Sequence, residues 1–211
     1  MKSLHNVLWS LVGLGARTLI QIVYFVLLAR ALGPKEYGAL SALLAIIYIF
    51  VPYSTWGAGD RLVKHVSRDR AKFNEYWGSA LLSILLFGTI FLIFTLLLYF
   101  LLLADKVAIL PVILLGISEL YFLRIIDISI QAFQAFDRLS HTAFIQFLFS
   151  FIRLLFTLLF VYFVPVHSIS VWAILYLLST VFAAISCLVI VRFKLGKGRY
   201  AFMHIKNNLL E

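Results

Sequence analysis

Six long runs of apolar residues dominate the chain, and short polar segments separate them. Each run matches or exceeds the about 20 residues that a helix needs to cross a hydrocarbon core of roughly 30 Å. None shows the alternating polarity over about ten residues that is typical of an outer-membrane barrel strand. The pattern therefore predicts six transmembrane helices, at residues 7–28, 37–56, 78–103, 107–132, 143–164 and 170–191.

The composition indicates an all-α integral membrane protein with almost no soluble part. Of the 211 residues, 64% are apolar and 13% are charged, whereas soluble domains are about 45–50% apolar and about 25% charged. These values exclude a disordered chain, a nucleic-acid-binding domain and an ordinary soluble enzyme. We therefore expect a single six-helix transmembrane bundle over residues 1–211, with a cytoplasmic tail at 192–211.

The distribution of basic residues predicts the topology. The net charge is +9, and in a membrane protein Lys and Arg mark the cytoplasmic side. Twelve of them flank the runs on the side of the two termini, three fall on the opposite side, and three lie inside the runs. We therefore expect a multi-pass protein of the cytoplasmic membrane with both termini in the cytoplasm and no nucleic-acid partner.

One sizeable hydrophilic segment, residues 61–77, lies between the second and third runs and is rich in Lys and Arg. We expect a short amphipathic helix that lies against anionic headgroups, where each cation contributes about 1 kcal/mol. The alternative is a solvated loop that carries only the topology signal.

Ionisable residues inside the runs are the most informative chemical feature, because each costs at least about 2.5–3.5 kcal/mol at the centre of a membrane helix. Arg17 and Arg153 lie near the middle of the first and fifth runs. The fourth run also has one polar side. Helical spacing places the following polar residues on one face of each run: Ser10, Arg17, Gln21 and Tyr24; Glu119, Arg124, Asp127, Gln131 and Gln134; and Gln146, Ser150, Arg153 and Thr157.

Three helices with polar faces can enclose one polar cavity. Arginine suits an anionic ligand there, because it stays charged and grips phosphate oxygens in a bidentate fork. The candidate substrate-binding residues of this cationic cavity are Arg17, Gln21, Arg124 and Arg153.

The acidic residues of the fourth run, Glu119 and Asp127, are candidates for ion coupling or for charge pairing with the arginines. Arg124 and Asp127 are three residues apart, so a simple neutralising pair is the alternative to a functional role.

Signals for catalysis are weak. The chain contains no HExxH, GxSxG or P-loop motif, each of which would mark a known reaction class. No histidine has the spacing of a metal ligand. The single cysteine, Cys187, lies in an apolar run, and we expect it to be a buried free thiol. We expect no enzyme activity, no catalytic residues, no metal and no cofactor.

The turn between the first two runs reads LARALGPKEYG over residues 28–38. Gly33 can end a helix in a left-handed conformation, and Pro34 fits the first turn of the next helix. A turn alone does not explain why Arg30, Tyr37 and Gly38 accompany them. The whole stretch resembles the signature of the polysaccharide flippases of the O-antigen type, within the superfamily of multidrug, oligosaccharidyl-lipid and polysaccharide exporters.

The resemblance implies a function. Flippases of this family move a polyprenyl-diphosphate-linked oligosaccharide across the cytoplasmic membrane by alternating access. The implied partners are this lipid-linked substrate, membrane lipids, and a polysaccharide polymerase or glycosyltransferases.

Members of this family typically have twelve or more helices in two related halves, and this chain corresponds to the amino-terminal half. We therefore expect a truncated reading frame that works with a missing second half, or a homodimer. The alternatives are a multidrug exporter of the same superfamily and a non-transporting membrane scaffold in a polysaccharide-synthesis complex.

Overall fold

The computed structural model describes the backbone of residues 2–195 and the side chains of residues 15 and 18–195. All the regular structure in this part of the chain is helical, as the sequence predicts. The elements are α1 (Lys2–Phe50), η1 (Val51–Tyr53), α2 (Ala58–Val66), η2 (Arg70–Lys72), α3 (Phe73–Leu102), α4 (Ile109–Ile117), η3 (Ser118–Phe122), α5 (Leu123–Ala135), α6 (Leu139–Phe163) and α7 (Ile169–Lys194).

Five helical segments of the described chain are long and apolar enough to cross a membrane, which makes the protein a multi-pass membrane protein. The third to sixth predicted runs each fall in one segment. The first two runs both fall in the first segment, so six separate crossings stay a prediction. The segments are Thr18–Val66, Arg70–Leu102, Ile109–Ala135, Leu139–Phe163 and Ile169–Lys194.

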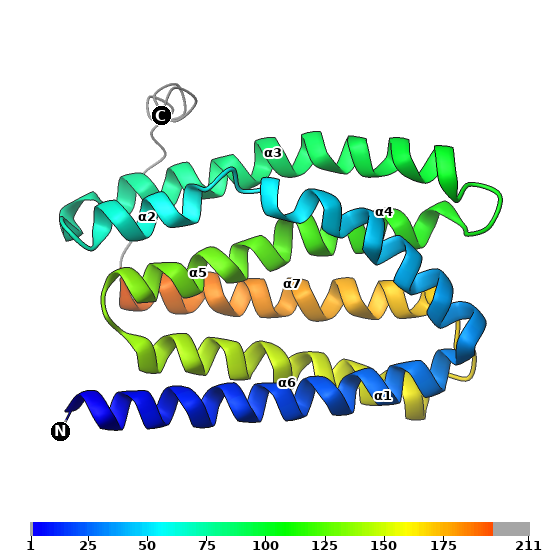
Figure 1. Ribbon diagram of the computed structural model, residues 1–211, viewed down its shortest axis with the longest axis horizontal. Helices are drawn as coiled ribbons and strands as arrows, with labels where there is room; N and C mark the ends of the chain where they lie inside the picture. The colour runs from blue at the N-terminus through cyan, green and yellow to red at the C-terminus, as the bar shows by residue number, and fades with distance from the viewer. Residues whose placement is uncertain (1, 196–211) are drawn as a thin grey trace.

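Helix α1 turns back on itself at Gly33, where the helical dihedral angles are interrupted by φ 68° and ψ 174°. Figure 1 shows the ribbon of α1 running along one edge of the molecule and then returning towards its middle. The positive φ agrees with the prediction, but the ψ value is extended rather than left-handed helical. Only glycine readily adopts this combination, and Pro34 then begins the returning part of the helix.

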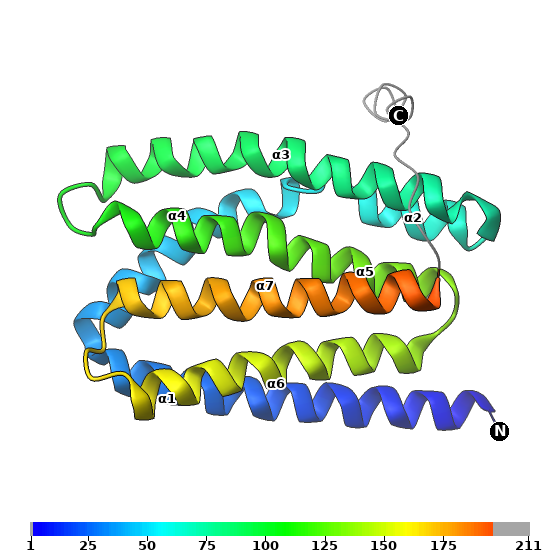
Figure 2. The same cartoon turned by 180° about the vertical axis from the view of Figure 1, so that it is seen from behind.

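The helices lie side by side along the long axis of the molecule (Figures 1 and 2). Helix α7 is central, because it packs against α4 and α5 on one side and against α6 on the other. The first part of α1 covers α6, and α3 covers α4 and α2. Cys187 of α7 is buried as a free thiol, as the sequence predicts. Large apolar side chains on the outer faces of α3, α6 and α7 are exposed, as expected of surfaces that contact lipid.

The predicted helix ends are corrected in several places. The second run, 37–56, extends beyond the end of the helix, because α1 ends at Phe50 and Pro52 lies in the short helix η1. Trp56 and Gly57 both have positive φ and turn the chain into α2. Helix α3 begins at Phe73, before the predicted residue 78, because Asn74 and Glu75 in its first turn lower the hydropathy there.

The amphipathic helix expected in the hydrophilic segment is α2, and its apolar face packs on protein. Leu62 and Val66 are 0% exposed, because α2 packs against α3 and α5. Asp60 and Lys64 on the opposite face are exposed. Protein covers that face, and the helix rules out the solvated-loop alternative for residues 61–66, whereas contact of its cations with anionic headgroups stays a prediction.

Substitution of Gly33 by Ala should lower the free energy of unfolding by about 1–3 kcal/mol, because alanine is strained at this φ and ψ. A Cβ at residue 33 meets nothing within 4 Å, so the effect is one of backbone strain alone. Thermal unfolding of the purified protein in one detergent measures it. Gly38→Ala is the matched control, since its Cβ also meets nothing within 4 Å and its φ is not positive. Equal unfolding temperatures for Gly33→Ala and wild type would contradict the account.

Candidate functional site

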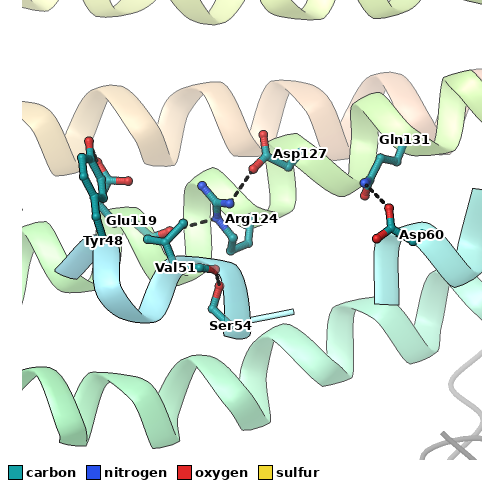
Figure 3. A network of polar contacts seen from close by, with 8 residues as sticks. All are labelled: Tyr48, Val51, Ser54, Asp60, Glu119, Arg124, Asp127 and Gln131. Atoms are coloured by element: carbon teal, nitrogen blue, oxygen red, sulfur yellow. Dashed lines mark hydrogen bonds and ion pairs between the residues drawn. The ribbon is translucent and has the colours of Figure 1, made fainter. Parts of the chain in front are cut away.

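The carboxyl group of Glu119 lies in the interior of the protein and is 2% exposed. Glu119 belongs to η3, a π-helical turn between α4 and α5, and such turns are rare and frequent at functional sites. Tyr176 of α7 donates its hydroxyl to Glu119 Oε1 at 2.6 Å. Tyr48 of α1 donates to the same oxygen at 3.4 Å (Figure 3). The two phenols thus stabilise a buried acid that would otherwise be costly.

The guanidinium of Arg153 on α6 is held by aromatic side chains from two other helices and its own. It donates a hydrogen bond to the hydroxyl of Tyr176. Its Cζ lies 5.4 Å from the ring centroid of Tyr24, 4.6 Å from that of Phe149 and 4.7 Å from that of Tyr176. Such cation–π contacts are worth about 2 kcal/mol or more when they are desolvated.

Tyr176 therefore joins a basic and an acidic side chain. Its oxygen accepts from Arg153 and its hydrogen goes to Glu119. The hydrogen bonds link α6, α7 and the η3 turn into one polar chain, and Tyr48 adds α1. The hydrogen-bond partner of Arg153 thus comes from another helix, α7.

Arg124 and Asp127 form an ion pair within α5. Nη1 of Arg124 lies 2.8 Å from Oδ2 of Asp127, and the side chains are 18% and 49% exposed (Figure 3). Nε of Arg124 also donates to the backbone carbonyl of Glu119 at 3.2 Å. The local pair that the sequence offered as one alternative is therefore present, and Arg124 also contacts the π-helical turn.

Two cavities open among the polar faces. The larger has a volume of about 290 Å³ and lies between α5 and α6, where Gln146 and Phe149 face the α5 side chains Asp127, Gln131 and Gln134. The smaller has a volume of about 50 Å³, lies between α1 and α6, and is lined by Ile20, Gln21, Tyr24, Phe149, Ser150 and Arg153. Phe149 lines both cavities.

The predicted site residues divide between these features rather than lining one cavity. Gln21 and Arg153 meet at the smaller cavity. Arg124 lines neither of the two, because its guanidinium is turned towards Asp127 and the carbonyl of Glu119. The side chain of Arg17 lies outside the described residues. Within the described residues, no group of three or more His, Cys, Asp or Glu could hold a metal ion.

The turn motif lies at the opposite end of the bundle from α2. Arg30 and Gly38 are exposed, and Tyr37 packs edge-on against Phe25 at a centroid distance of 5.5 Å. Glu36, which sequence reasoning did not single out, accepts a hydrogen bond from the backbone nitrogen of Ile169 at 2.9 Å. Glu36 therefore caps the start of α7, where an acidic group is favourable.

Sequence reasoning also missed Tyr48 and Tyr176. Both lie in apolar runs, where a tyrosine does not differ in pattern from a packing aromatic. A periodicity signal was present only for Tyr24, on the polar face of the first run.

Tyr176→Phe should destabilise the protein by about 1.5–3 kcal/mol, the range for hydrogen bonds to charged groups. The change removes one hydroxyl that serves both Arg153 and Glu119 and leaves the ring in place. Thermal unfolding in detergent measures the effect, with Tyr162→Phe as the matched control because Tyr162 is 72% exposed. The same unfolding temperature for both variants would show that the hydrogen bonds of the Tyr176 hydroxyl contribute nothing to stability.

Comparison with known families identifies one match. The sequence model of the family described as polysaccharide biosynthesis protein matches residues 3–211, nearly the whole chain. No curated protein and no solved structure matches the chain. The family match confirms the resemblance of the turn motif, and the apolar helices agree with it. The chain is therefore a multi-pass membrane protein that belongs to the polysaccharide biosynthesis protein family.

Proposed function

We propose that this chain takes part in moving a polyprenyl-diphosphate-linked oligosaccharide across the cytoplasmic membrane by alternating access. The observation that carries the proposal is the polar interior between α1, α5 and α6, where two cavities are lined by polar and charged side chains. Ionisable residues inside membrane segments are costly and mark substrate pathways by default. Family membership supports a role in polysaccharide synthesis rather than another membrane process.

Arg153 is the residue best suited to attract the diphosphate. Its Nε is buried and has no hydrogen-bond partner, so a phosphate oxygen would satisfy a donor that the protein leaves open. Gln21 lines the same cavity, and Arg17 precedes Gln21 by one helical turn. The volume of about 50 Å³ is below the about 300 Å³ of ordinary ligand pockets. Binding therefore requires α1 and α6 to separate, as alternating access provides.

The acidic residues favour charge pairing over ion coupling in this proposal. Asp127 is paired with Arg124 at 2.8 Å, and Glu119 is bonded to two tyrosines. The multidrug-exporter alternative calls for an acidic cavity that attracts organic cations. The ion pair of Asp127 weakens that alternative, because Asp127 is the acid that lines the larger cavity.

The end of the bundle that contains α2 faces the cytoplasm in this proposal. Nη1 of Arg138 donates to the carbonyl of Lys194 at 3.2 Å, so the start of α6 and the end of α7 meet there. The basic residues of α2 lie at the same end (Figure 1), which fits the positive-inside rule. A second half or a second copy would complete the transport path, and a polymerase or glycosyltransferases would be the functional neighbours.

Arg153→Gln should reduce the polysaccharide exported by the host at least about tenfold, the effect of about 1.4 kcal/mol, because a charged phosphate contact is worth about 1.5–3 kcal/mol. Surface polysaccharide is measured in a strain that lacks the wild-type copy, beside the amount of protein in the membrane. Arg192→Gln, an exposed change in the last turn of α7, is the matched control.

Arg153→Lys tests charge apart from geometry and should restore part of the export. If Arg153→Gln fails to accumulate in the membrane, the export by Arg153→Lys tests the role of Arg153 in its place. Full export by a normally accumulating Arg153→Gln variant would remove Arg153 from the mechanism.

A further inference from the structure

The larger cavity contains amide groups rather than the cations that a diphosphate requires. Asp127, Gln131 and Gln134 follow one another at spacings of four and three residues on α5, and Gln146 faces them from α6. None of the described side chains that line it is Lys or Arg. Its volume of about 290 Å³ is close to the lower end of ligand pockets, about 300 Å³.

These groups match the hydroxyl groups of a saccharide. Each glutamine amide offers two donors and an acceptor oxygen, and a carboxylate adds acceptors, whereas a sugar hydroxyl needs one partner of each kind. The ring of Phe149 adds an apolar surface to the same cavity, and sugar rings have an apolar C–H face. A phosphate would instead meet the carboxylate of Asp127, which disfavours it.

Neighbouring residues hold two of these polar side chains in place. Nε2 of Gln131 donates to Oδ1 of Asp60 on α2 at 3.4 Å, and Asp127 is held by Arg124 (Figure 3). The amide of Gln131 lies directly against Gly59, so that a Cβ at residue 59 would overlap with it. Contacts from α2 and from Arg124 therefore restrain two of the side chains that line the cavity, which favours selective binding because less side-chain freedom remains to be lost.

Phe149 lines both this cavity and the one that contains Arg153. The guanidinium of Arg153 lies 4.6 Å from the centroid of the Phe149 ring. The two compartments thus share the ring of Phe149 and differ in charge, because Arg153 lines the smaller one and no described Lys or Arg lines the larger one. A lipid-linked saccharide has the same order of groups, since its sugar follows directly on its diphosphate.

We propose that the cavity between α5 and α6 is a saccharide-binding subsite, in which Gln131, Gln134, Gln146 and Asp127 bind sugar hydroxyls while the diphosphate is directed to Arg153. This inference rests on the proposed function. In this inference the amide side chains determine which sugar binds, whereas Arg153 binds the diphosphate that all such substrates share.

The test compares two probes on the purified full chain in lipid nanodiscs. One is the lipid-linked oligosaccharide extracted from the host's own membranes, and the other is undecaprenyl diphosphate without a sugar. The double variant Gln134→Leu/Gln146→Leu removes hydrogen bonds at similar side-chain volume. It should weaken binding of the sugar-bearing probe about tenfold and leave binding of undecaprenyl diphosphate within about twofold of wild type.

Two further variants sharpen the comparison. Gln21→Leu is the matched control from the other cavity and should weaken both probes alike. Gly59→Ala should weaken only the sugar-bearing probe, because the new methyl group displaces the amide of Gln131. This variant tests the same subsite without changing a glutamine. If the double variant fails to fold, Gly59→Ala alone tests whether the subsite binds the sugar.

The outcomes separate the two proposals. A selective loss of the sugar-bearing probe in the double variant or in Gly59→Ala supports the subsite. An equal loss of both probes, or no loss in either variant, overturns the subsite and leaves the proposed function standing. Failure of the wild-type chain to bind either probe overturns the proposed function, and the subsite with it.

Discussion

The buried carboxyl group of Glu119 is the constraint on which the rest of the polar interior depends. A charge at membrane depth is tolerated only when its partners are in place, and here they come from different parts of the chain. Tyr176 and Tyr48 both reach one oxygen of Glu119, and Tyr176 also accepts from Arg153. These bonds link α1, α6 and α7 to the π-helical turn, so the buried acid is satisfied only when these helices are in register.

The same constraint explains why the interior divides into compartments. Arg124 is engaged by Asp127 and by the carbonyl of Glu119, and Arg153 is enclosed by aromatic rings. Of the arginines that the sequence offered for one cationic cavity, Arg153 lines the smaller cavity and Arg124 lines neither of the two. Three glutamines and Asp127 provide the polar lining of the larger cavity. The smaller cavity is lined by Arg153, whose Nε has no hydrogen-bond partner.

Sequence reasoning located the helices because hydropathy depends on the residues alone, whereas contacts depend on register between helices. The pair of Arg124 and Asp127 was foreseeable because both lie on one helix, three residues apart. The hydrogen bonds that Tyr176 makes to Arg153 and Glu119 were not foreseeable, because its hydroxyl meets Arg153 only when α6 and α7 are aligned. The π-helical turn at residues 118–122 has no sequence pattern of its own. The amphipathic character of α2 was visible, but whether lipid or protein covers Leu62 depends on the tertiary packing.

The central claim is that this chain moves a lipid-linked saccharide from one leaflet to the other. Inverted membrane vesicles from the host test it most directly, because a membrane-impermeant sugar oxidant added outside reaches only the cytoplasmic leaflet. In vesicles that contain the chain, the lipid-linked oligosaccharide should become protected from the oxidant as it moves to the lumenal leaflet. In vesicles without the chain it should stay fully oxidisable. Equal protection in both kinds of vesicle would contradict the account.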